Sequence, residues 1–304
     1  MKKQLSAIDK AVIATAFEAL NTKLYSSNLG YFKDPFIKLF TKDKPKKMLP
    51  IINRGTWSRV FAFRNIIEKF LSINDEYKQI ISLGSGMDST YFYLKEKYPT
   101  KNFKFFELDF ESVCKDKMEY ISSAQNLMTL KGDQLYLCPI DLRDLENLKK
   151  CFSNYNMKPD APTLVIAECI LVYLTNECST SVLKTLSDYF QELIVLNYEM
   201  INPFDSFGKV MVENIELRGC KLYGLQGCPK IENQIERMKS AGLVEVEALD
   251  MLHLYQMLDL EERKRIEKLE IFDEFEEWNL LQSHYLFVYA RKYKPGSFIQ
   301  NIKI

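Results

Sequence analysis

The hydrophobic pattern of the chain changes near residue 79. Before it, residues 7–20 carry apolar side chains at the spacing of an amphipathic helix, and mixed helical and loop segments continue to Lys78 without a strand signal. Short apolar, β-branched or aromatic runs then alternate with helix-length segments, at 79–83, 103–108, 135–140, 163–167 and 193–198. This rhythm predicts a mostly parallel sheet wound with helices.

The C-terminal third continues with helices and two last strands. A helix is expected from Pro203 to about Arg218, and another over 229–241 that stops at Gly242. The remaining expected elements are strands at 243–248 and 284–291 and, between them, a charged helical run at 258–277. A run of that composition ordinarily forms a solvated face.

Together these elements predict an α/β fold in one compact unit. Residues 1–78 would form an N-terminal helical cap or lid, and residues 79–304 would form the core with a sheet of seven strands and helical insertions near its C-terminus. A length of 304 residues with 47% apolar side chains suffices for one large domain of this kind.

Composition narrows the classes of function. The 41 basic and 41 acidic side chains cancel, so net charge gives no reason to expect a nucleic-acid partner. The seven cysteines form no C-x-x-C pair and there are two histidines, which argues against a disulfide framework or a metal site and favours the reducing cytoplasm. The first apolar stretch is broken by charges, so we expect neither a signal peptide nor a membrane span.

The clearest local motif is a glycine turn, Leu83-Gly84-Ser85-Gly86, which follows an expected strand and precedes a helix-like segment. Such a turn lets a ligand approach the backbone closely at a helix N-terminus, although a structural tight turn is the alternative. Ser89 stands where a dinucleotide fingerprint needs its third glycine. A nicotinamide or flavin site is therefore disfavoured.

Acidic residues follow the next expected strands. Asp109 ends the second strand about 25 residues after Gly84, where an acid would accept from ribose hydroxyls. Asp141 follows the third strand and could accept from an adenine amino group, or cap a helix. Glu168 ends the fourth strand, where an unpaired acid would be costly. One nucleoside ligand could touch all these residues at the carboxyl edge of the sheet.

An ordered set of motifs resembles the leucine carboxyl methyltransferases. The similarity extends from about Lys23 to the helix at 207–214. Its motifs are Asn53-Arg54-Gly55, the segment Leu83 to Thr90, Phe106-Glu107-Leu108-Asp109-Phe110, Asp141-Leu142-Arg143-Asp144 and Ala167-Glu168-Cys169-Ile170-Leu171-Val172-Tyr173. It implies a Rossmann-like class I methyltransferase fold and S-adenosylmethionine as the methyl donor, leaving S-adenosylhomocysteine.

The resemblance also assigns residues to the site. Lys23 and Arg54 match the basic residues at the methionine end of the cofactor, and Gly84 matches the glycine of the nucleoside loop. The remaining cofactor positions are Asp109 at the ribose, Asp141 and Leu142 at the adenine, and Glu168 in the lining of the cleft. From its own segment, Arg54 could equally be a surface arginine lying over Trp57 or Phe61.

The implied reaction is methyl esterification of the C-terminal leucine carboxylate of the protein phosphatase 2A catalytic subunit, by a monomer without a membrane or nucleic-acid partner. Such a carboxylate is ionised at neutral pH, so the enzyme has to position and desolvate it rather than deprotonate it. Arg54 would hold the carboxylate, because a guanidinium fork matches it. Tyr173 would line the same pocket, or be a core tyrosine with a satisfied hydroxyl.

Three other functions remain open from the sequence. A carboxyl methyltransferase acting on a modified tRNA base of the wybutosine type shares these motifs, although balanced charge argues against tRNA. The site motifs alone do not exclude a methyltransferase that acts on a small-molecule acid. A regulator that binds the cofactor without catalysis is disfavoured by the intact acids and glycines.

Overall fold

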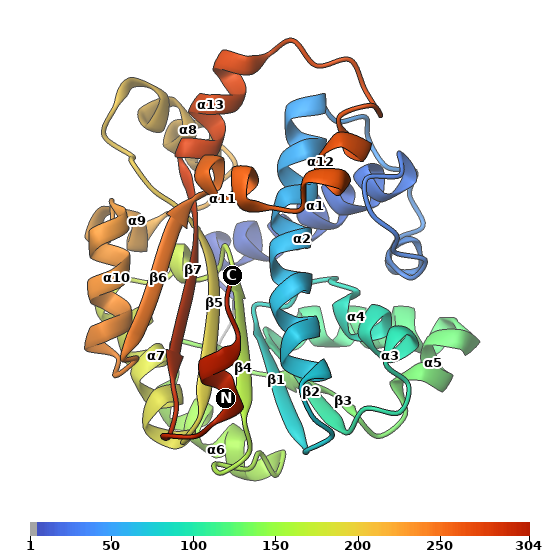
Figure 1. The fold of residues 1–304 in the computed structure, drawn as a ribbon, viewed down its shortest axis with the longest axis vertical. Coiled ribbons are helices and arrows are strands. Elements are labelled where there is room, and N and C mark those ends of the chain that lie inside the picture. The colour runs from blue at the N-terminus through green and yellow to red at the C-terminus, as the bar shows by residue number, and fades with distance from the viewer. Residues whose placement is uncertain (1–4) are drawn as a thin grey trace.

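A computed structural model describes residues 5–304. Its centre is a seven-stranded sheet in the order β3-β2-β1-β4-β5-β7-β6, in which β7 is antiparallel to both of its neighbours (Figure 1). The strands are β1 (Lys78–Leu83), β2 (Phe103–Asp109), β3 (Leu135–Pro139), β4 (Thr163–Glu168), β5 (Leu193–Met200), β6 (Glu245–Asp250) and β7 (Tyr285–Lys292). The sequence expectation of a mostly parallel sheet with seven strands is confirmed.

The middle residues of the central strands are apolar because both faces of the sheet are covered. In β1, Ile80 faces one hydrophobic layer and Ile81 the other, and Phe105 and Phe106 of β2 divide in the same way. Since successive side chains of a strand point to opposite faces, a sheet between two helical layers needs continuous apolar runs rather than alternation.

Helices from the N-terminal half cover one face. They are α1 (Ala7–Asn28), η1 (Ile37–Phe40), α2 (Pro50–Ser72), α3 (Thr90–Lys97), α4 (Glu111–Ser123) and α5 (Gln125–Lys131). The opposite layer is formed by α6 (Leu145–Asn154), α7 (Asn176–Tyr189) and α10 (Ile231–Ser240). The N-terminal helices share one hydrophobic core with the sheet. In Figure 1, α2 lies across the face of the sheet.

The remaining helices gather mainly beyond the carboxyl ends of the parallel strands. They are η2 (Leu171–Tyr173), α8 (Ser206–Glu216), α9 (Tyr223–Gly227), α11 (Met251–Met257), α12 (Leu260–Ile266) and α13 (Phe275–Ser283), while η3 (Phe298–Asn301) lies near the C-terminus. In Figure 1, α8 and α11 to α13 stand above the strands. They therefore enclose the edge at which parallel sheets bind ligands.

Two expectations for helices need correction. The first helix extends to Asn28, past the predicted residue 20, because the apolar pattern continues through Leu20 and Leu24. The charged run 258–277 is not one helix with a solvated face. It breaks after Ile266, and Glu270 in the break accepts hydrogen bonds from the Tyr31 hydroxyl and the Asn53 amide, both at 2.9 Å.

Other sequence expectations concern cysteines, metals and membranes. All seven cysteines are free thiols, and residues 5–304 contain no cluster of three or more metal-ligating side chains. Within that range, no helix is both long and apolar enough to cross a membrane.

Candidate functional site: a cavity at the carboxyl edge of the sheet

The glycine turn after β1 adopts a backbone that few other residues tolerate. Gly84 has a φ of +60° and Gly86 a φ of +53°, both in the left-handed region. A Cβ atom on Gly84 would lie 2.5 Å from Cδ1 of Ile170, and one on Gly86 would lie 3.0 Å from Cβ of Ala16 on α1. Glycine is therefore required by both conformation and space.

Asp109 is fixed against this turn. Its Oδ2 accepts the amide of Gly86 and its Oδ1 accepts the amide of Phe110, each at 2.7 Å. Burial raises the pKa of Asp109, and the two amides oppose that rise. A carboxylate with two lone pairs used by the backbone keeps others for a ligand, so the geometry suits the predicted ribose contact.

A small hollow of about 50 Å³ lies beside Asp109, and Leu142 and Asp141 line it. Asp141 accepts from the guanidinium of Arg143 at 2.7 Å, and Arg143 also pairs with Asp9 of α1 at 2.9 Å. The hollow is the predicted adenine position, and the first turn of α1 is tied across it.

The main cavity has a volume of about 620 Å³ and shares Gly84, Asp109 and Tyr173 with the small hollow. Side chains from α1, α2, the glycine turn, the β4 end and α8 line it. This volume is ordinary for a small-molecule or cofactor site. The lining includes the glycine turn and apolar residues of α8 and α13.

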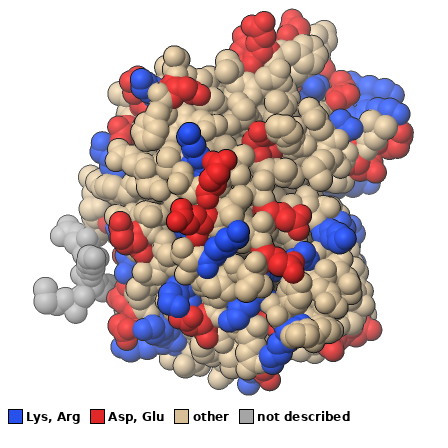
Figure 2. Space-filling model, turned by 60° about the vertical axis from the view of Figure 1, so that its left-hand side comes forward, with Lys and Arg blue, Asp and Glu red and all other residues tan. Residues whose placement is uncertain are grey.

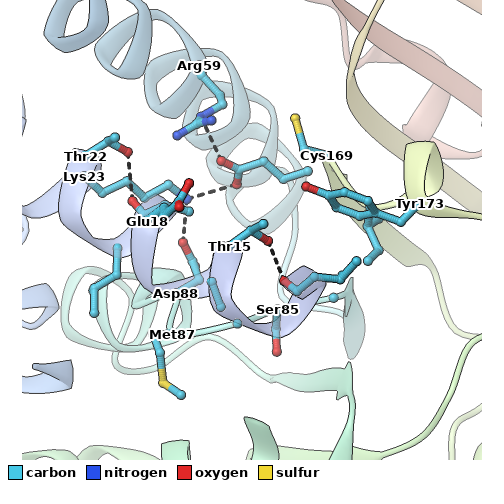
Figure 3. A pocket seen from close by; sticks show the side chains of 18 of the residues that line it. Thr15, Glu18, Thr22, Lys23, Arg59, Ser85, Met87, Asp88, Cys169 and Tyr173 are labelled. Atoms are coloured by element: carbon cyan, nitrogen blue, oxygen red, sulfur yellow. Dashed lines mark hydrogen bonds and ion pairs between the residues drawn. The ribbon is translucent and has the colours of Figure 1, made fainter. Parts of the chain in front are cut away.

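An alternating set of charges crosses the cavity (Figure 3). Lys23 Nζ lies 2.7 Å from Asp88 Oδ2 and 3.0 Å from Glu168 Oε2, and Arg59 Nε lies 2.8 Å from Glu168 Oε1. The structure therefore brings together Lys23 and Glu168, two of the residues that the resemblance assigns to the site. Asp88 and Arg59 join them.

These contacts decide the protonation states. Burial alone would lower the pKa of Lys23, but Asp88 and Glu168 outweigh it and hold that pKa above its ordinary value. Burial would raise the pKa of Asp88, yet Lys23 and Lys117 hold it well below its ordinary range. Burial would likewise lower the pKa of Arg59, but Glu168 outweighs it and holds that pKa above its ordinary value. Lys23, Asp88 and Arg59 are therefore charged at neutral pH.

A second buried ion pair is linked to the glycine turn through the backbone of Asp88. Lys117 Nζ contacts Glu107 Oε2 at 2.5 Å and donates to the backbone carbonyl of Asp88 at 2.7 Å. Burial raises the pKa of Glu107 to about 7, although Lys117 opposes the rise. This pair connects β2 and α4 to the segment that carries Asp88.

Tyr173 lines the cavity, as expected, and its hydroxyl faces Thr15 of α1. Burial raises the pKa of Tyr173 well above its ordinary range, so the hydroxyl stays neutral. Cys169 also lines the cavity and has a φ of +50°, unusual for a residue with a side chain. Its strained position directs the chain from β4 into η2.

Arg54 lies elsewhere. Its guanidinium carbon is 3.6 Å from the centre of the Phe272 ring and 5.8 Å from that of Trp278, and it is absent from the residues that line the cavity. Arg54 and Arg59 are five positions apart, which separates them by about 140° around an α-helix. Arg54 thus faces the C-terminal helices, and its predicted role at the cofactor stays a prediction.

Sequence reasoning missed two members of the charge network. Arg59 was passed over because Arg54 stands in the recognisable motif, and Asp88 because it reads as part of the glycine turn. The helical spacing of Ile52, Arg59 and Phe63, which share the cavity face of α2, was a usable signal.

A sheet in this order, with a glycine turn after β1 and a fixed acid after β2, belongs to the class of Rossmann-like methyltransferases. A putative methyltransferase from Thermobifida fusca, of known structure, shares the fold with a TM-score of 0.55 and 15% identity, over 90% of this chain and 94% of the other.

The sequence comparisons give the family. The family model described as leucine carboxyl methyltransferase matches residues 11–187. The chain is 38% identical to a leucine carboxyl methyltransferase 1 homolog of Arabidopsis thaliana, over 95% of this chain and 91% of the relative. It is 34% identical to leucine carboxyl methyltransferase 1 of Bos taurus, with coverages of 93% and 90%. The chain belongs to the leucine carboxyl methyltransferase family and is a methyltransferase.

A related but longer protein also matches. The human tRNA wybutosine-synthesizing protein 4 is 31% identical over 86% of this chain, which corresponds to 41% of that protein. The relatives named leucine carboxyl methyltransferase match at higher identity and over nearly their whole length.

Proposed function

We propose that this protein uses S-adenosylmethionine to methylate the C-terminal leucine carboxylate of the protein phosphatase 2A catalytic subunit. The observation that carries the proposal is one cavity that is lined both by the nucleoside-type residues Gly84 and Asp109 and by apolar residues of α8. Membership in the leucine carboxyl methyltransferase family supports the acceptor.

The residues of the nucleoside-type part of the lining fit the cofactor. Asp109 can accept hydrogen bonds from ribose hydroxyls, and the hollow lined by Leu142 suits a flat base. Lys23, between Asp88 and Glu168, can bind an amino acid carboxylate while the two acids accept its ammonium group. When bound, the cofactor supplies an electrophilic methyl group on a sulfonium.

The transfer is a balanced displacement. A lone pair of the acceptor carboxylate forms the new O–CH₃ bond, and the electrons of the broken S–CH₃ bond stay on sulfur. The products are a neutral methyl ester and a thioether, and no proton is transferred. The protein's contribution is to position the carboxylate and exclude water.

The proposed reaction needs no side chain that gains or loses a proton. The acceptor is already ionised at neutral pH, so no general base is required. Neither His253 nor His284 is among the lining residues, and burial holds the Tyr173 hydroxyl neutral. We therefore expect the methyl transfer rate to be nearly flat from about pH 6 to about pH 9, since no essential base titrates there.

Labelled cofactor tests the proposal directly. Incubation with the phosphatase catalytic subunit should place label on the full-length subunit and not on one lacking its terminal leucine. The label should be released as methanol by mild alkali, because the product is an ester. An alkali-stable product, or equal labelling of the truncated subunit, contradicts the proposal.

The tRNA reading has one observation in its favour, the similarity to the wybutosine-synthesizing protein. Basic and acidic side chains are interspersed on the face shown in Figure 2, and the sequence has no net charge. A tRNA site would need a basic surface. Labelling of tRNA but not of phosphatase under the same conditions would decide for this alternative.

We also propose that the enzyme is a cytoplasmic monomer. The seven free thiols support a reducing compartment, because disulfides are rare in the cytosol. Sedimentation of the purified protein and fractionation of the source cells test the two statements separately.

A further inference from the structure

The segment 33–47 between α1 and α2, called the lysine loop below, differs in charge from the rest of the chain. The whole sequence carries 41 basic and 41 acidic side chains, whereas this segment has six exposed lysines and one exposed acid, Asp43. Within residues 5–304, none of the six ammonium groups forms an ion pair or a hydrogen bond. In Figure 1 the segment is the blue loop at the right. Its lysines are Lys33, Lys38, Lys42, Lys44, Lys46 and Lys47.

Hydrogen bonds to both neighbouring helices hold the backbone of the lysine loop. Near its beginning, Arg64 of α2 donates to the carbonyl of Lys33 at 2.8 Å. Near its end, Asn21 of α1 accepts the amide of Lys46 at 2.7 Å. The positive charges are therefore presented from a fixed backbone, so less backbone entropy is lost when a partner binds to them.

The lysine loop lies beside the main cavity. Ile37 in the loop and Met48 just after it line the cavity, and their sequence neighbours Lys38 and Lys47 are exposed. In the proposed function, the cavity has to hold the cofactor and the end of the acceptor chain. Because an extended peptide advances about 3.3 Å per residue, the residues that precede the acceptor's terminus have to lie outside the cavity, at its edge.

We infer that the lysine loop binds acidic residues of the acceptor protein that precede its C-terminal leucine by a few positions. This inference rests on the proposed function and adds a surface that selects among acceptors. Charges on exposed side chains attract over about 8 Å at physiological salt, so no shaped pocket is needed. Such a contact lowers the acceptor's KM and speeds its association without touching the reacting atoms.

The extent of the charge favours a protein partner. Nucleic acids and anionic membranes are also drawn to lysines, but they bind through broad basic surfaces. The positive charge here is confined to one loop of a chain whose charges otherwise cancel. An acidic stretch of a peptide chain is of matching size.

The test uses leucine-terminated peptides that differ only in the residues before the last two, where they carry aspartates or asparagines. Fluorescence anisotropy with S-adenosylhomocysteine present measures binding, and labelled S-adenosylmethionine measures methylation. At about 0.05 M salt the wild-type protein should bind the aspartate peptide about threefold to tenfold more tightly, since each exposed ion pair contributes little by itself. The difference should disappear near about 0.5 M salt because the charges are then screened. The two peptides should have the same kcat.

A variant of the lysine loop should lose this preference and keep the affinity for S-adenosylhomocysteine and the kcat. It combines Lys42→Gln, Lys44→Gln, Lys46→Gln and Lys47→Gln.

The matched control removes the same charge from exposed lysines on or beside α6 and α10, in the opposite helical layer, and should keep the preference. Circular dichroism checks that both variants fold. The control combines Lys150→Gln, Lys158→Gln, Lys230→Gln and Lys239→Gln.

Three outcomes with peptides overturn the inference: equal affinity of the wild-type protein for both peptides, a preference that persists in the loop variant, or an equal loss in the control. Binding of tRNA or of phosphatidylserine vesicles that depends on the loop, without a preference between peptides, also overturns it and assigns the loop to that partner. A wild-type protein that prefers the aspartate peptide through the loop but methylates neither peptide is different. That result contradicts the proposed function and leaves the loop a peptide-binding surface.

Discussion

At the scale of single residues, the site depends on side chains whose hydrogen bonds are partly used by the fold. Asp109 serves the Gly86 amide, the Phe110 amide and, in the proposed function, the ribose. Glu168 binds Lys23 and Arg59 at once. Each carboxylate is thereby fixed in place before a ligand arrives, so binding does not have to order it.

Asp109→Ala should weaken S-adenosylhomocysteine binding by about tenfold to a hundredfold, because each lost bond to a charged acceptor is worth roughly 1.5 to 3 kcal/mol. Titration calorimetry measures the change. The exposed acid Asp160 offers a control, since Asp160→Ala removes the same charge at a residue that lines neither the cavity nor the small hollow. Equal affinities for the two variants would refute the ribose assignment.

At the scale of elements, the turns after β1 and β4 determine where the residues of the site lie. The glycine turn can pass Ile170 closely because it has no Cβ, and the same Ile170 begins the segment that leads to Tyr173. The turns that follow β1 and β4 are therefore in close contact.

Gly84→Ala should lose stability and cofactor affinity together, because a Cβ would lie 2.5 Å from Ile170 at a φ of +60°. Gly296→Ala is a matched control, with a φ of +86° but no atom within 4 Å of its Cβ. Both changes carry the backbone cost of about 1 kcal/mol. Thermal melts should show a clearly larger loss for Gly84→Ala, and similar losses would show that the contact with Ile170 is unimportant.

Glu199 gives η2 a pH-dependent support. It lies buried in β5, facing the backbone amides of Ile170, Leu171 and Val172, and burial raises its pKa to about 8, with Arg237 opposing the rise. An acid whose pKa is higher in the folded state contributes stability below its unfolded pKa, and that contribution is lost as pH rises toward 8.

Glu199→Gln should remove this dependence. Relative to the variant, the wild-type protein should lose up to about 1.4 kcal/mol of unfolding free energy per pH unit between about pH 5 and about pH 8. Urea unfolding at several pH values measures the difference. A constant difference across this range would mean that Glu199 is ionised throughout in the folded protein.

At the scale of the whole molecule, the cavity is enclosed by parts of the chain that are distant in sequence. Residues of α1, α8 and α13 line the same space as the strand ends. A ligand that contacts them together should therefore stabilise the whole fold rather than one loop.

S-Adenosylhomocysteine at about 100 times its dissociation constant should add roughly 2.7 kcal/mol to the stability. A rise of several degrees in the melting temperature follows for a chain of this size. NAD serves as the control nucleotide, because the turn lacks the third glycine of a dinucleotide site. Stabilisation by NAD alone would contradict the proposed cofactor.

The sequence by itself determined the succession of strands and helices along the chain and the positions of the strand-end residues. Apolar runs have to form buried strands, and parallel strands bring Gly84, Asp109 and Glu168 to one edge whatever surrounds them. Local pattern was sufficient because these features depend on neighbours in sequence and on the rule of parallel pairing.

The tertiary structure alone decided which side chains meet in the cavity. A segment rich in charges, 258–277, would be solvated by itself, yet its middle packs on α2 and places Phe272 over Arg54. The rotation of α2 against the sheet then turned Arg59, not Arg54, toward Glu168. Such choices depend on packing between helices far apart in the chain, and a motif specifies the residues without specifying the face they occupy.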